Sequence, residues 1–391
     1  MAGTIFHRTE LAERMVKGIM ASAVGSASAS GLFLAAPRRT GKSTFVREDL
    51  RPALQKCGAT VLYVDLWANK QADPGAVIVG AVRAELAKHD GIVAKLAKSV
   101  GMEKVTVGGV AFSLDRVGLG KEISLSGALA ALSDETKQPI VLLIDEAQHA
   151  ITTDGGYDAL FALKAARDEL NSSEHYGLRI VATGSNRDKL AMLRNSKDQA
   201  FFGAPLVSFP ALDADYILWF CKGVGLAGPL DPDAVMTLFR RAGHRPEILG
   251  AAADSIRFDF NIKPADVGAA FAKAVGEQIE EADQQTLRVI QALTPLQSAV
   301  LRVLARDGEK YAPFETGTME SYRAMLSALA IGEATVPDVS NVQASLGALQ
   351  EKSLIWKEKR GVYSLEESTT AELMRQHGLL EVPGSHAPRP R

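Results

Sequence analysis

Short runs of apolar residues alternate with helix-like stretches over the first 210 residues of the chain. Four runs are clear, at residues 31–36 (GLFLAA), 60–65 (TVLYVD), 140–145 (IVLLID) and 178–183 (LRIVAT), and a fifth candidate is 205–210 (PLVSFP). Continuous apolar runs of this length fit strands that are buried on both faces of a parallel sheet. The alternation of strands and helices therefore predicts an α/β domain of three layers.

Beyond the fifth run the pattern becomes helical. Asp231 has the residue type of an N-cap, with a proline after it, and another helix is predicted to begin near Pro246. A long helix is predicted from about residue 265 to 289. Thr294 opens the sequence TPLQ, a capping-box pattern, which indicates that a new unit begins there. We therefore place a domain boundary near residue 290.

The C-terminal part, residues 294–366, is predicted to run helix, helix, helix and hairpin. This order resembles a winged helix, a fold that often places its third helix in a DNA major groove. The exposed face of that third helix is predicted to carry uncharged residues: Asn341, Gln343, Ala344, Gly347 and Gln350. Positive charge comes from the hairpin instead, at Lys357, Lys359 and Arg360. DNA binding and a protein-docking or lid-packing role both stay open.

The segment APRRTGKST, residues 36–44, joins the first predicted strand to an amphipathic helix, which is the context that a phosphate-binding P-loop requires. Backbone N–H groups of such a loop, and the N-terminus of the helix after it, attract phosphate oxygens. Lys42 is expected to reach the β- and γ-phosphates, and the Ser43 hydroxyl to bind Mg²⁺. The predicted nucleotide-binding residues are Pro37, Arg38, Arg39, Thr40, Gly41, Lys42, Ser43 and Thr44.

Two acidic residues, Asp145 and Glu146, end the third predicted strand, and ligands of open α/β sheets bind at the carboxyl ends of strands. Asp145 is expected to hold Mg²⁺, directly or through water, and Glu146 to act as a general base on the attacking water. The fourth strand ends in a polar cluster that is either a simple turn or part of the site. We favour the site, with Ser185 and Asn186 as joint candidates to bridge the γ-phosphate and the water.

At these residues the chain resembles the archaeal-type ATPase branch of the STAND NTPases, relatives of the replication-initiator AAA+ proteins. The resemblance spans roughly residues 5–370, and its markers are FHRTEL (6–11), PRRTGKS (37–43), IDEAQ (144–148), ATGS (182–185) and GHRP (243–246). It implies a sheet in the order 5-1-4-3-2, a helical lid and a C-terminal winged helix. It also implies that Phe6 and Arg8 lie against the adenine, and that Arg245 contacts the γ-phosphate from the lid.

The chain departs from the family pattern in two places. The first position of the P-loop motif, a glycine in its standard form, is Ala36. Where related proteins often carry an arginine finger, this chain has residues 202–204 (FGA). Arg187 or Arg194 could substitute for that arginine, and the sequence does not choose between them. Assembly into a hydrolysing ring therefore stays open.

The composition is that of a globular protein: 391 residues, 47% hydrophobic and 23% charged, with a formal net charge of −2 and a pI of about 6.4. This balance disfavours a dedicated polyanion binder. No stretch reaches the roughly 18 uncharged apolar residues of a membrane span, and the N-terminal residues lack the apolar segment of a signal peptide. We therefore expect no membrane partner and a cytoplasmic location.

The predicted domains are a P-loop NTPase core (1–210), a helical lid (211–290), a winged helix (291–370) and a partly disordered tail (371–391). A small hairpin of no assigned function is predicted at residues 105–114. The predicted function is that of an ATP-binding and hydrolysing switch, with ATP and Mg²⁺ as ligands and with DNA as a candidate target of the winged helix. The alternative is a regulatory switch whose winged helix docks a protein, and self-association is a further candidate interaction.

Overall fold

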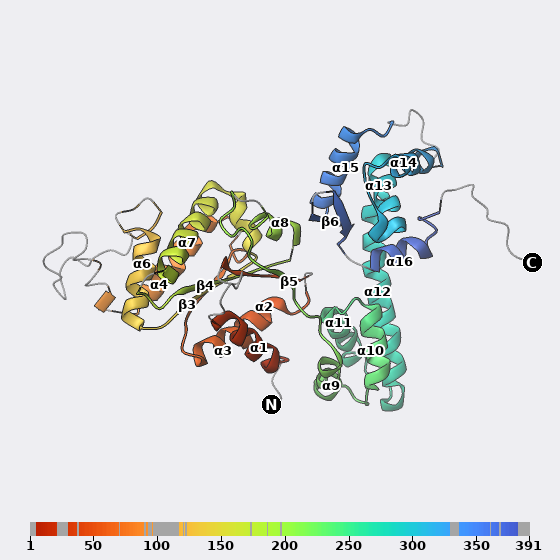
Figure 1. Cartoon of the computed structure of the whole chain (residues 1–391). Helices are drawn as coiled ribbons and strands as arrows, with labels where there is room; N and C mark the ends of the chain where they lie inside the picture. The colour runs from red at the N-terminus through yellow and green to blue at the C-terminus, as the bar shows by residue number, and fades with distance from the viewer. Residues whose placement is uncertain are drawn as a thin grey trace, which may run out of the picture. The chain divides into compact units, whose positions relative to one another are not determined.

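The computed structural model describes residues 5–21, 30–36, 39–69, 71–89, 91–92, 96, 117–119, 121, 123–172, 174–185, 187–195, 198–328, 336–359, 361–366 and 369–381. The chain forms two compact units, one from Gly3 to Pro210 and one from Ala211 to Arg391. Figure 1 labels the elements of both units. The hairpin predicted at 105–114 and the tail beyond 381 lie outside the described residues.

A five-stranded parallel sheet organises the first unit. Its strands are β1 (Leu32–Ala35), β2 (Thr60–Asp65), β3 (Ile140–Asp145), β4 (Leu178–Gly184) and β5 (Leu206–Ser208). They lie in the order β2-β3-β4-β1-β5, so the predicted topology is confirmed. Every residue of β3, the most apolar run of the sequence, is buried. Because all pairs are parallel, the carboxyl ends of the strands share one edge of the sheet.

Helices cover both faces of this sheet. They are α1 (Thr9–Met20), α2 (Lys42–Phe45), η2 (Val46–Leu50), α3 (Arg51–Lys56), α4 (Pro74–Leu86), α6 (Leu125–Thr136), η4 (Ala147–Thr152), α7 (Asp154–Ser172) and α8 (Arg187–Met192). On β3, Leu142 packs with the α4, α6 and α7 side and Leu143 with the α1 and α3 side, as the period of two along a strand requires. The predicted three-layer α/β arrangement is therefore confirmed.

The helix after the P-loop runs from Lys42 to Lys56 as α2, η2 and α3. The residues at its internal junctions are all right-handed helical, and η2 is a single π-helical stretch. Asp49 lies in that stretch and is buried. Its carboxylate lies 2.7 Å from His7 Nδ1 and accepts a 3.1 Å hydrogen bond from the Arg8 amide. The segment before α1 is therefore tied to the P-loop helix.

The second unit is helical except for one hairpin. Its elements are α9 (Ala214–Gly223), α10 (Pro232–Arg241), α11 (Pro246–Arg257), η5 (Pro264–Asp266), α12 (Val267–Gln291), α13 (Pro295–Asp307), η6 (Gly308–Lys310), α14 (Thr316–Ala328), α15 (Val339–Glu351), β6 (Ile355–Lys359), β7 (Val362–Leu365) and α16 (Thr369–Gln376). The predicted N-cap at Asp231 and the capping box at Thr294 are both formed.

The C-terminal helices and the hairpin share one apolar core, in which α13 lies against α14, α15 and β7. The predicted order of three helices and a hairpin is observed, whereas its assignment as a winged helix stays a prediction. None of the helices in the described part of the chain is long and apolar enough to cross a membrane.

Gly156, near the start of α7, allows η4 to pack closely against that helix. A Cβ atom at Gly156 would lie 2.1 Å from the carbonyl oxygen of Ala150, a backbone atom that cannot swing away. Gly156→Ala should therefore lower the free energy of unfolding by about 1–3 kcal/mol, the usual cost of overpacking. Gly80→Ala is the matched control, because a Cβ there meets nothing within 4 Å.

Gly80 lies inside α4, so the control substitution should stabilise the protein by about 0.5–1 kcal/mol through helix propensity. Urea unfolding followed by circular dichroism measures both changes. Equal unfolding midpoints for the two variants would contradict the described packing of η4 on α7.

Candidate active site

The loop between β1 and α2 has an unusual backbone. Arg39 and Gly41 both adopt left-handed conformations, with φ of 62° and 82°. Glycine takes this conformation at no steric cost, whereas an arginine is strained by it. Gly41 has no side chain to cap α2, so the first N–H groups of that helix stay available to a ligand. Residues 39–44 line a cavity of about 320 Å³, together with Asp65, Trp67, Asp145 and Glu146.

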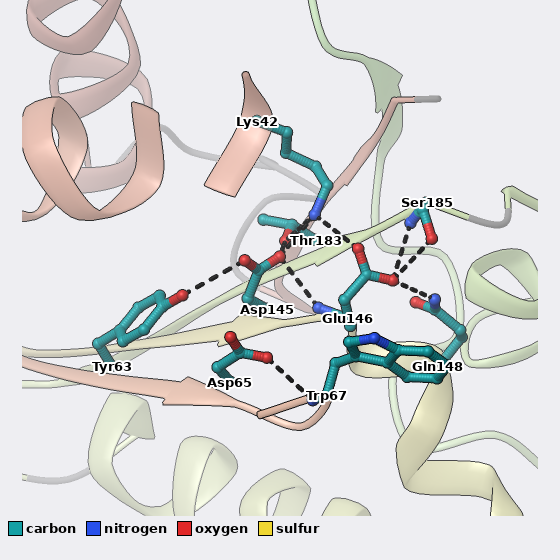
Figure 2. A network of polar contacts seen from close by, with 9 residues as sticks. All are labelled: Lys42, Tyr63, Asp65, Trp67, Asp145, Glu146, Gln148, Thr183 and Ser185. Carbon is teal, nitrogen blue, oxygen red and sulfur yellow. Dashed lines mark hydrogen bonds and ion pairs between the residues drawn. The ribbon is translucent and has the colours of Figure 1, made fainter. Parts of the chain in front are cut away.

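Lys42 lies at the centre of a buried polar network (Figure 2). Its side chain is 4% exposed, and its Nζ donates hydrogen bonds to Asp145 Oδ1 at 2.5 Å, Glu146 Oε1 at 3.1 Å and Thr183 Oγ1 at 3.1 Å. Two carboxylates therefore neutralise this buried ammonium. A charge removed from water requires such partners, and a bound phosphate would compete with them.

Asp145 is 1% exposed and is held by donors from four directions. Besides Lys42, the Thr183 hydroxyl and the Glu146 amide donate to Oδ1, and the Tyr63 hydroxyl donates to Oδ2 at 3.3 Å. Burial alone would raise the pKa of Asp145. The charge of Lys42 and the hydrogen bonds from Lys42, Ser43 and Thr183 nevertheless hold that pKa below its ordinary value, so the carboxylate is ionised.

Glu146 follows β3 with a left-handed backbone, φ 53°, which turns the chain from the strand into η4. Its Oε2 accepts hydrogen bonds from the Ser185 hydroxyl at 2.7 Å, the Ser185 amide at 3.3 Å and Gln148 Nε2 at 2.5 Å. Burial acts to raise the pKa of Glu146, but the charge of Lys42 and these hydrogen bonds lower it below its ordinary value. The side chain is therefore a carboxylate that can accept a proton.

The structure brings most of the predicted site residues together. Those that line the cavity are Arg39, Thr40, Gly41, Lys42, Ser43, Thr44, Asp145 and Glu146. Ser185 joins them through its bonds to Glu146. Pro37, Arg38 and Asn186 lie outside the described residues.

Other predicted residues lie away from this cavity. The Arg8 guanidinium donates to the Pro210 carbonyl at 2.7 Å and lies 5.0 Å from the centre of the Phe209 ring. Phe6 precedes the segment that Asp49 holds, and neither Phe6 nor Arg8 lines the cavity. Their predicted contact with adenine is therefore not tested.

The predicted lid and finger arginines also stay untested. Arg245 is the N-cap of α11 in the second unit and donates to the Ala242 carbonyl at 3.0 Å. Arg187 donates to the Ser208 hydroxyl, and Arg194 to the side chain of Asn195. These contacts do not decide which arginine, if either, acts as a finger.

Besides Gln148, which donates to Glu146, three side chains of this site have no role in the sequence analysis. Thr183 belongs to the polar cluster that ends the fourth predicted strand, but its bonds to Lys42 and Asp145 depend on the pairing of β3 with β4. Asp65 ends β2 as Asp145 ends β3, and the two residues are register partners. Trp67 lines the cavity and packs against His149, with ring centres 4.3 Å apart and the ring planes tilted by 38°. Only Asp65 carried a usable signal, an acid at the end of an apolar run.

The oxygen atoms of Ser43 and Asp145 fit the needs of Mg²⁺. The two side chains are hydrogen-bonded to each other, so a hydroxyl and a carboxylate meet beside the P-loop. Mg²⁺ prefers few protein oxygens and takes its other ligands from water and phosphate. Among the described residues, no group of three or more His, Cys, Asp or Glu could hold a metal by itself. The residues present therefore fit a magnesium ion that arrives with a nucleotide.

Replacing Lys42 by Ala should destabilise the first unit, because it leaves two buried carboxylates without their cation. Breaking a buried ion pair costs about 3–5 kcal/mol. In the wild-type protein the pKa of Asp145 is lower in the folded state than in the unfolded state. This difference stabilises the fold at pH values above the unfolded-state pKa, and the stabilisation is lost as the pH falls through the folded-state pKa. Without Lys42, burial dominates and raises that pKa, so the variant loses stability as the pH rises.

The stability difference between wild type and Lys42→Ala should therefore be larger at pH 7 than at pH 4.5. Urea unfolding at the two pH values measures it. Adding Asp145→Asn to the variant should recover part of the loss at pH 7, because it removes one uncompensated charge. A difference that does not change with pH would show that Lys42 contributes packing alone.

Solved structures of other proteins share the fold of this chain. No protein-family model and no curated protein matches the chain. The Walker-type ATPase paby2304 of Pyrococcus abyssi is similar in structure, with a TM-score of 0.57 and 17% identity over 95% of this chain and 96% of that one. The Aeropyrum pernix ORC2 protein is similar in its ADPNP-ADP complexes (TM-score 0.52, 16% identity, 98% and 94% covered) and its ADP form (0.55, 15%, 96% and 96%). The chain therefore has the fold of the AAA+ P-loop ATPases.

Proposed function

We propose that the protein binds ATP with Mg²⁺ at Lys42 and hydrolyses it, and that it acts as a nucleotide-dependent switch. One observation carries this proposal: Lys42, Asp145, Glu146 and Thr183 form a buried network in a cavity next to the N-terminus of the P-loop helix. The likeness to the ORC2 protein, which was solved with ADPNP and ADP, supports a nucleotide as the ligand.

Each residue has a distinct part in this proposal. Backbone N–H groups of residues 40–44 bind phosphate oxygens, and Lys42 exchanges its carboxylate partners for the β- and γ-phosphates. Ser43 and Asp145 hold the magnesium ion, which neutralises charge on the phosphates when it is bound. Glu146 orients the attacking water and takes its proton. Ser185 and Asn186 follow β4 in the sequence and are the joint candidates to bridge the water and the γ-phosphate.

Two further contacts belong to the proposal. Phe6 and Arg8 lie against the adenine, a role that the bonds of Asp49 to His7 and Arg8 support by fixing the segment beside the P-loop helix. Arg245 contacts the γ-phosphate from the second unit, so that the nucleotide state sets the lid angle.

The target of the switch follows from the charge of the C-terminal helices. The helix α15, which would be the recognition helix of a winged helix, contains no Lys or Arg. Protein–DNA contacts are dominated by basic residues on phosphate, so α15 favours a protein partner. The positive residues of the β6–β7 hairpin leave DNA as the second candidate.

Glu146→Gln should keep ATP bound but slow its hydrolysis by about 100-fold or more, because a positioned general base contributes that much. Calorimetric titration measures binding, and release of inorganic phosphate measures turnover. The amide keeps the size of the side chain, so loss of binding would reveal a structural defect instead. Hydrolysis at the wild-type rate would mean that another residue is the base.

If the C-terminal region binds DNA, the contacts must come largely from Lys357, Lys359 and Arg360. Each neutralised phosphate contributes about 0.9 to the slope of log affinity against log salt, so the slope should be roughly −3. Changing all three residues to Ala should abolish this salt dependence and leave ATP affinity intact. Fluorescence anisotropy with a labelled duplex measures both slopes. A slope that survives the triple change would place DNA elsewhere, and no binding at low salt would favour a protein partner.

A further inference from the structure

Gln148, two residues after the proposed base, is buried, with 3% of the residue exposed. Its Nε2 donates to Glu146 Oε2 at 2.5 Å (Figure 2). Its Oε1 is buried and has no hydrogen-bond partner among the described residues. Leaving a buried amide oxygen unpaired costs free energy, and an apolar side chain of similar size would avoid that cost. The hydrogen bond to Glu146 is therefore the contact that explains why a polar side chain is buried here.

Gly184, the last residue of β4, makes the space that Gln148 occupies. A Cβ atom at Gly184 would lie 2.4 Å from Gln148 Oε1 and 3.3 Å from its Cδ. The backbone of Gly184 is also fixed, since its carbonyl accepts a hydrogen bond from the Ala36 amide at 3.2 Å and β4 pairs with β1 there. A side chain at this position would have to push the amide of Gln148 away, since the strand cannot move.

The two oxygens of Glu146 have different surroundings. Oε2 receives three donors, two from Ser185 and one from Gln148. Oε1 contacts Lys42 Nζ at 3.1 Å. If Lys42 turns to a phosphate, Oε1 loses this partner and Oε2 keeps all of its own. The arrangement therefore singles out Oε1 as the oxygen that becomes available.

We propose that Gln148 is a positioning residue for Glu146: with Ser185 it fixes Oε2, so that Oε1 alone is presented to the attacking water, and Gly184 provides the room for it. This inference rests on the proposed ATP hydrolysis and deepens it. A carboxylate held at one oxygen cannot rotate to exchange its two oxygens. The orientation of the base is thereby set before the nucleotide arrives, which is how enzymes avoid reorganisation during a reaction.

A double-mutant cycle on Gln148 and Gly184 tests the proposal. Gln148→Ala should lower kcat by about tenfold, the value of one hydrogen bond to a charged group, while the affinity for a non-hydrolysable ATP analogue changes by less than about twofold. Gly184→Ala should reproduce this loss by displacing the amide. In the Gln148→Ala background the added Cβ meets only Leu190 Cδ1, at 3.2 Å, and the end of that side chain can shift by a few tenths of an ångström. Gly184→Ala should therefore cause little further loss of kcat there.

Gln71→Ala and Gly80→Ala are the matched controls, since Gln71 is exposed and Gly80 has open space around it. Both should keep the wild-type kcat. Two results would overturn the proposal: a wild-type kcat for Gln148→Ala, or a loss from Gly184→Ala that stays undiminished when Gln148 is already Ala. A fall in nucleotide affinity equal to the fall in kcat would also overturn it, because a positioning role acts on turnover.

A second measurement separates this inference from the proposed function. The side-chain amide signals of Gln148, assigned in an NMR spectrum by their loss in Gln148→Ala, should shift in Gly184→Ala and in Glu146→Gln. This readout needs no hydrolysis. If wild-type protein does not turn over ATP but these signals shift, the proposed function fails and the contact stands. If they do not shift, the positioning role is wrong even for an active ATPase.

Discussion

The structure of the site depends on one buried charge, the ammonium of Lys42. At 4% exposure it has lost nearly all of its water, and Asp145 and Glu146 replace that water as its partners. Low-dielectric surroundings strengthen this attraction, but they also make each ion costly if its partner is lost. The loop after β1 and the ends of β3 and β4 must therefore meet at one edge, and the parallel sheet provides that edge.

The same ion pairs explain how a phosphate could replace the carboxylates as the partner of Lys42. Lys42 already lies in the cavity beside the helix N-terminus, which favours an anion. A phosphate that enters the cavity would therefore find the ammonium group in place. The carboxylates that Lys42 leaves are not stranded. Asp145 keeps Thr183, Tyr63 and Ser43, and Glu146 keeps Ser185 and Gln148, since hydrogen bonds from neutral groups hold both.

Much of the fold was predictable because polar or acidic residues end the apolar runs of the strands. The runs at β2 and β3 end in acids and match the observed strands residue for residue, and Thr294 forms the capping box that its sequence predicts. The contacts of the site were less predictable. They depend on the left-handed turn at Glu146, which brings Gln148 against Gly184 of β4, a strand distant in sequence. Residue spacing alone does not contain that packing, so Thr183 and Gln148 were missed.

Calorimetric titration of the whole protein with ATP, with and without Mg²⁺, tests the central claim most directly when wild type is compared with Lys42→Ala. Lys273→Ala is the control, because Lys273 is an exposed residue of the second unit. We expect the wild type and the control to bind one ATP in the presence of Mg²⁺, and Lys42→Ala to lose at least about tenfold in affinity, as the loss of a charged contact of about 1.5–3 kcal/mol implies. Equal affinity in all three proteins, or no binding by the wild type, would contradict a phosphate site at Lys42.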